Sequence, residues 1–169
     1  MPYLSSAAFG AHGGVDAMTV LFAALIGVVA GLRAMTAPAA VSWAAHLGLI
    51  DLSDTPLAFL GYAWTPWILT ALAAAELVTD QLPSTPSRKV PMQVGARLVT
   101  GALSGAAIGA AGGSLIAGLV AGIIGALIGT YGGAAARAHL ATRFGRDLPA
   151  ALIEDLVAVG LALLVVASL

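Results

Sequence analysis

The chain consists largely of apolar runs that are long enough to cross a membrane as helices. These runs occupy 16–47, 63–82, 95–111, 114–140 and 148–169. A membrane-spanning helix needs about 20 consecutive apolar residues. None of the runs shows the short alternating pattern of a membrane β-barrel, and the helix is then the structure that satisfies every backbone group in lipid. The sequence therefore predicts an all-α, polytopic transmembrane helical bundle.

The composition excludes most other classes of protein. Of 169 residues, 60% are hydrophobic and only 9% are charged, whereas soluble domains carry about 25% charged residues. The net charge of −1 gives no attraction to nucleic acid, and there is no cysteine for thiol chemistry or disulfides. We therefore expect the lipid bilayer as the main partner and no nucleic-acid partner.

Two of the runs exceed a single straight span, and each contains a sequence that predicts a break. In the first run, Pro38 removes a backbone donor, so we expect a span to about Leu32 and a second short helix from Pro38 to His46. In the fourth run, the break is expected at Gly133, which follows Tyr131 and Gly132. The prediction is about five spans in a single membrane domain, 16–169, after a flexible N-terminal tail, 1–15.

Basic residues orient this five-span arrangement. One basic loop contains Arg88 and Lys89, between Pro83, Pro86 and the next helix, and the other contains Arg143 and Arg146. Basic loops lie on the cytoplasmic side, and in a five-span chain both loops fall on the same side. This places the N-terminus in the cytoplasm and the C-terminus outside.

A weak internal repeat relates 27–47 (GVVAGLRAMTAPAAVSWAAHL) to 125–145 (GALIGTYGGAAARAHLATRFG). Both copies begin with Gly-x-x-x-Gly, break at small residues and resume as an alanine-rich helix. The repeat halves would be 16–82 and 114–169, with 95–111 as a spacer helix, and an odd spacer inverts the second copy across the bilayer. Inverted repeats with broken helices are typical of secondary transporters. The alternative is chance similarity between two segments of biased composition.

Glycine recurs at helical spacing in the third and fourth runs. Such faces allow helix backbones to touch, so the two runs are expected to pack very closely, as a glycine zipper. The alternatives are packing within one subunit and a homodimer interface. The packing positions are Gly101, Gly105, Gly109, Gly125, Gly129 and Gly133.

Glu76 and Asp80 are spaced to lie on one face of the second span. A charge near the centre of a span costs about 2.5–3.5 kcal/mol, so Glu76 is expected to face protein or water and to have a cationic partner. The candidates are Arg33, Arg97 and Arg137, and Arg97 is favoured because it begins the next helix. Either a structural salt bridge or an ion, proton or substrate site accounts for this pair.

Five further residues complete the candidate site. Arg33 and Thr36 lie at the first break beside Pro38, where free amides and a guanidinium group favour an anion; the alternative is an arginine that extends to the interface. Glu154 and Asp155 are adjacent in the last run and point about 100° apart on a helix. They either complement the positive end of that helix or line the same cavity as Glu76.

The stretches 31–38 (GLRAMTAP) and 76–88 (ELVTDQLPSTPSR), with the Arg97 helix and the Glu154–Asp155 helix, resemble the bacterial membrane family catalogued as domain of unknown function 4126. The resemblance covers most of the chain from about Val15. It implies an integral protein of the bacterial inner membrane, and it brings no assigned activity. Its marked polar positions correspond to Arg33, Glu76, Asp80, Pro83, Pro86, Arg88, Glu154 and Asp155.

Three functions fit the residues. The first is a small transporter or channel for an ion or small solute, coupled to protons through an intramembrane carboxylate and active as a homodimer. The second is a membrane scaffold or assembly protein that packs through its glycine faces. The third is an enzyme acting on a lipid-linked substrate, which is disfavoured because neither a metal-ligand set nor a catalytic triad is evident. No cofactor and no metal are predicted.

Overall fold

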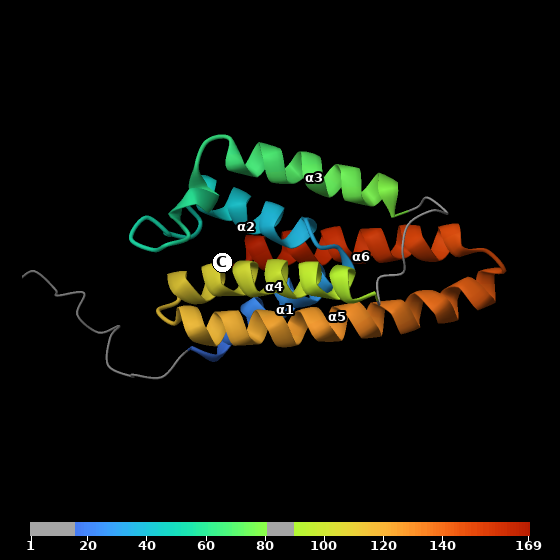
Figure 1. Ribbon diagram of the computed structural model, residues 1–169. Helices are drawn as coiled ribbons and strands as arrows, with labels where there is room; N and C mark the ends of the chain where they lie inside the picture. The colour runs from blue at the N-terminus through green and yellow to red at the C-terminus, as the bar shows by residue number, and fades with distance from the viewer. Residues whose placement is uncertain (1–15, 81–89) are drawn as a thin grey trace, which may run out of the picture.

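The computed structural model describes residues 16–80 and 90–169, and this part of the chain is a bundle of helices without strands (Figure 1). The elements are α1 (Ala17–Leu32), α2 (Thr36–His46), the short 3-10 helix η1 (Ala58–Gly61), α3 (Thr65–Thr79), α4 (Pro91–Ala111), α5 (Leu115–Phe144) and α6 (Asp147–Ala167). By length and composition, α4, α5 and α6 are able to cross a membrane, and α1 and α3 are shorter apolar helices. The prediction of an all-helical chain is confirmed for the described residues, and three of the helices are long and apolar enough to span a membrane. The predictions for 1–15 and for Pro83, Pro86, Arg88 and Lys89 lie outside the described residues.

The first break is a reversal of direction. α1 ends at Leu32, Arg33 is extended, and α2 begins at Thr36, with Pro38 in its first turn. Leu49 and Ile50, which follow α2, line the same cavity as Asp16 and Met18, which begin α1. α2 therefore runs back along α1 (Figure 1). The break was expected at this position, and the short helix starts two residues earlier than expected.

The predicted break at Gly133 is wrong. α5 runs without interruption from Leu115 to Phe144, through Tyr131 and Gly132. Glycine inside a helix costs only about 1 kcal/mol relative to alanine, and no proline follows it here to remove a backbone donor. The helix ends at Gly145 instead, where φ is +67°.

The two ends of the described chain lie at one end of the bundle. Asp16 and Leu169 line the same cavity of about 360 Å³. The prediction that the chain starts and finishes on opposite sides is therefore wrong for the described residues, because α2 adds a reversal that the five-span count lacks. Asp51 also lines this cavity, and the hydroxyl and the backbone amide of Ser53 donate to it and lower its pKa.

Glycines bring α4 and α5 into backbone contact. A Cβ on Gly105 would lie 2.4 Å from the carbonyl oxygen of Gly118, and a Cβ on Gly122 would lie 2.2 Å from that of Gly101. A Cβ on Gly109 would lie 2.5 Å from the carbonyl oxygen of Ser114. These antiparallel helices therefore pack at a distance that no larger residue permits at these positions.

α1 and α5 run in the same direction and make reciprocal glycine contacts. A Cβ on Gly27 would lie 2.2 Å from the oxygen of Gly122, and a Cβ on Gly125 would lie 2.0 Å from the oxygen of Ala24. Further along, Gly31 meets Ala126 while Gly129 meets Val28. When 27–31 is aligned with 125–129, the contacts of Gly27 and Gly31 correspond to those of Gly125 and Gly129. The two helices are therefore related by a local two-fold axis that is parallel to them. The inversion predicted for the two segments is therefore wrong.

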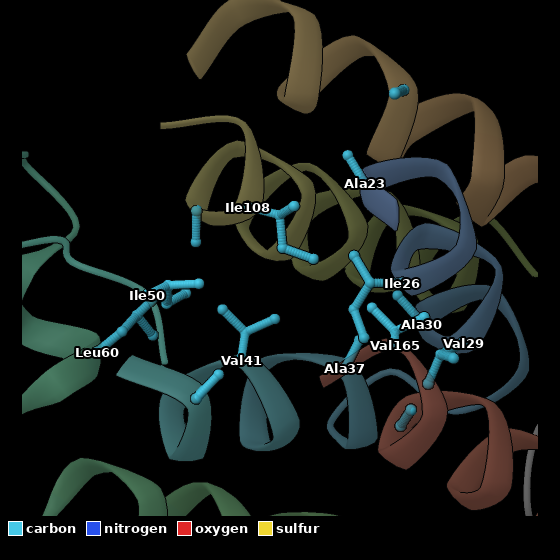
Figure 2. Packing of buried hydrophobic residues seen from close by; sticks show 14 of the residues in the cluster. Ala23, Ile26, Val29, Ala30, Ala37, Val41, Ile50, Leu60, Ile108 and Val165 are labelled. Carbon is cyan, nitrogen blue, oxygen red and sulfur yellow. The ribbon is translucent and has the colours of Figure 1, made fainter. Parts of the chain in front are cut away.

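The buried apolar core lies among α1, α2, α4 and α6, and it includes the segment that follows α2. Figure 2 shows Ile26, Val41, Ile108 and Val165 meeting from these four helices. α3 reaches this core through the partly buried Leu69, buries Pro66 and Ala73, and packs mainly against α2 and η1. Trp43 of α2 donates to Thr70 of α3 (2.9 Å). α3 is therefore a peripheral helix that α2 connects to the rest of the bundle.

Candidate functional site

At the reversal between α1 and α2, two charged side chains from other helices form hydrogen bonds with backbone groups at the helix ends. The Glu76 carboxylate of α3 accepts the amides of Ala34 (2.7 Å) and Met35 (2.8 Å), which precede α2. The Arg97 guanidinium of α4 donates to the carbonyls of Gly31 (2.8 Å) and Leu32 (2.6 Å), which end α1. Helix ends leave such groups without intrahelical partners, and in lipid each unsatisfied group costs several kcal/mol. The anion favoured at these amides is therefore the protein's own Glu76.

Arg33 lies inside this reversal and is completely buried. Its Nε donates to Asp155 of α6 (2.6 Å), and its Nη1 donates to Asp80 at the end of α3. The ion pair with Asp155 also involves Nη2. One guanidinium group therefore joins α3 and α6 to the turn between α1 and α2.

Asp80 lies between two guanidinium groups. Its Oδ2 accepts from Arg33 and lies 3.7 Å from Nη2 of Arg97. The same Nη2 is 4.0 Å from Glu76, so Arg97 is the arginine that faces Glu76, as the sequence favoured. We call Arg33, Glu76, Asp80, Arg97 and Asp155 the charged cluster.

A second group of charges adjoins this cluster along α5 and α6. Arg137 donates to Asp147 (3.0 Å) and lies 3.5 Å from Glu154. Glu154 and Asp155 therefore point to different arginines, in keeping with their angle on the helix. Arg137, a candidate partner of Glu76, pairs with these acids instead.

The charged cluster lies where α1, α3 and α4 have their ends, whereas α5 and α6 continue past it (Figure 1). Glu76 is in the last turn of α3, because that helix ends at Thr79. Arg97 is in the second turn of α4, and Asp155 is in the third turn of α6. α1, which ends at the cluster, has 16 residues and a length of about 24 Å. Gly31, at the end of α1, meets Ala126 and Gly129, so the cluster is level with the middle of α5.

Two parts of the site could not be predicted from the pattern of side chains in the sequence. Ala34 and Met35 take part through their backbone amides, and Asp147 joins through the turn between α5 and α6. The Thr36 hydroxyl, in the first turn of α2, is buried and has no hydrogen-bond partner among the described residues. No group of three potential metal ligands occurs in the described part of the chain.

Glu76→Gln is expected to lower the free energy of unfolding by about 1.5–3 kcal/mol, because the amide loses the charge and turns a donor toward one backbone N–H. Thermal unfolding of the purified protein in detergent measures this loss. Asp54→Asn is the matched control, because Asp54 is an exposed acid in the loop after α2. Equal stability of the two variants would contradict the capping role.

The comparisons with known proteins give no relative. No family model matches the chain, no curated protein is significantly similar to it, and no solved structure matches its fold. The resemblance to domain of unknown function 4126 stays a prediction.

Proposed function

We propose that this protein is a small membrane transporter or channel for an ion or small solute, and that the charged cluster is its site. The supporting observation is the complete burial of Arg33 between Asp80 and Asp155, which come from two different helices. Ionisable groups inside a membrane bundle are costly and mark ion or substrate pathways. Broken helices form the binding sites of many transporters.

The packing supports a division into a fixed part and a moving part. Backbone contacts at glycine hold α4 against α5 and α5 against α1. α3 packs mainly against α2 and η1, and Glu76 and Asp80 join its C-terminal end to the turn and to α4. Loss of charge on Asp80 would weaken that connection. Movement of α3 is therefore the step that we assign to coupling with protons.

The membrane setting is part of the proposal. We place the protein in the bacterial inner membrane with Arg143 and Arg146 in the cytoplasm, following the distribution of basic residues. The described chain would then begin and end on the outer side. A second copy of the chain would supply further walls for a pathway, and we propose a homodimer.

Flux through reconstituted vesicles tests the proposal. Vesicles with a sealed pH-sensitive dye receive gradients of protons, sodium, potassium or small carboxylates. We expect wild type to dissipate at least one gradient about tenfold faster than protein-free vesicles, and Asp80→Asn to abolish this because the site has lost an ion-pairing carboxylate. Asp54→Asn should keep the wild-type rate.

The second candidate is a membrane scaffold. It is favoured by the observation that Glu76, Asp80 and Arg33 all have opposite charges or backbone groups as partners. If wild type matches protein-free vesicles for every gradient, the transporter proposal is wrong. If Asp80→Asn then changes only thermal stability, the cluster is a structural element of such a scaffold.

A further inference from the structure

Asp80 occupies the position of an anion between two buried cations. A single oxygen, Oδ2, accepts from Nη1 of Arg33 and lies 3.7 Å from Nη2 of Arg97. The Arg33 side chain is 0% exposed and the Arg97 side chain is 1% exposed. Two guanidinium groups this close to one another need an anion between them, because burial makes an uncompensated charge very costly.

The helix that supplies this anion is the one with the least packing against the core. Among the described residues α3 reaches the apolar core through the partly buried Leu69, and Asp80 is the C-cap that follows its last residue, Thr79. The side chains of Asp80, Glu76 and Asp155 are 14%, 14% and 13% exposed, whereas both arginines are covered. A molecule that approaches the cluster therefore meets these carboxylates first, and it reaches the point between the two arginines by taking the place of Asp80.

The surroundings of Asp80 specify the chemistry of that molecule. At the position of the Asp80 carboxylate the nearest charges are the two guanidinium groups, which favour an anion over a metal cation. A carboxylate matches the planar donors of arginine and copies the group that it displaces. A further donor lies beside the reversal: Oγ1 of Thr36, in the first turn of α2, is buried and makes no hydrogen bond among the described residues.

We infer that Arg33 and Arg97 form a binding site for a small carboxylate anion, which enters by replacing the side chain of Asp80. The inference rests on the proposed function in one respect, since it names the class of solute that the transporter would carry. Binding of the anion releases Asp80, which caps α3, from the two arginines. Exchange of an internal carboxylate for an external one thereby links occupancy of the site to the position of the peripheral helix.

Chemical rescue tests the site without a transport assay. Asp80→Ala, made in the full chain and purified in detergent, removes the internal carboxylate and should unfold at a lower temperature than wild type. Formate at about one hundred times its Kd should raise the Tm of this variant by about 5 °C, because a ligand bound only to the folded protein stabilises it. The same formate should move Asp54→Ala by much less, and chloride at equal ionic strength should not replace formate.

Three results would overturn the inference. In the first, formate shifts Asp80→Ala no more than Asp54→Ala. In the second, methyl phosphate rescues and formate does not, which would assign a phosphate ligand such as a lipid headgroup. In the third, the rescue persists in Asp80→Ala/Arg97→Gln. If Asp80→Ala aggregates in chloride, the variant is purified in formate and the yield of folded protein is measured in place of the Tm. If it aggregates in both salts, Asp80→Asn is measured instead, and the absence of a rise in its Tm with formate would also overturn the inference.

Rescue and flux separate the two proposals. Rescue without flux in any gradient would keep the carboxylate site and reject transport. Flux without rescue would keep transport and reject the carboxylate as the solute class.

Discussion

Arg33→Met is expected to lower the free energy of unfolding by about 3–5 kcal/mol, because Asp80 and Asp155 lose the cation between them while staying largely buried. Methionine keeps most of the side-chain volume, so the loss reflects the charge and its hydrogen bonds. Thermal unfolding in detergent, followed by the fluorescence of Trp43 and Trp67 between α2 and α3, measures the effect.

Two further variants show what causes this loss of stability. Arg33→Lys restores the charge without the planar donors that reach two acids at once, and should recover only part of the loss. Arg143→Met removes an exposed arginine and should change stability by no more than about 0.5 kcal/mol. If Arg33→Met is as stable as Arg143→Met, then Arg33 does not hold the bundle together.

The second large effect is expected at Gly122, where α5 touches α4. Gly122→Ala should destabilise the protein by about 3 kcal/mol, because the added Cβ would lie 2.2 Å from the oxygen of Gly101 and 3.0 Å from Cα of Gly105. All of these atoms belong to the backbone, so the two helices have to separate. Unfolding temperature and resistance to protease in detergent both report this separation.

Gly132→Ala is the control in the same helix, and its effect should have the opposite sign. A Cβ at Gly132 meets nothing within 4 Å. Alanine favours a helix interior over glycine by about 1 kcal/mol, so this variant should be slightly more stable than wild type. Destabilisation of similar size by both substitutions would show that helix propensity and not backbone contact explains the glycines.

The sequence allowed the class of structure and the location of the first break to be predicted, because both depend on local signals. Apolar run length marks the helices, and Pro38 marks the boundary between α1 and α2. The pairing of Arg97 with Glu76 was also accessible, since a buried acid requires a cation and few are available.

The remaining features depend on contacts between distant segments. A break in a helical pattern does not reveal whether the next helix continues or turns back, and α2 turns back against a core built by α1, α4 and α6. Gly133 resembles a break locally, yet α5 continues through it. The capping of Ala34 and Met35 by Glu76 involves backbone groups, which every residue possesses, so side-chain patterns give no sign of it.

The reciprocal contact between α1 and α5 has a consequence for biosynthesis. α1 leaves the ribosome first, and its glycine face has no partner until α5 follows, roughly one hundred residues later. During that interval the face of α1 that carries Gly27 and Gly31 lacks the helix that it packs against in the folded bundle. The order of translation therefore makes α5 the element that completes this contact, and a nascent chain stalled before α5 would expose the glycine face of α1 to insertases and quality-control proteases.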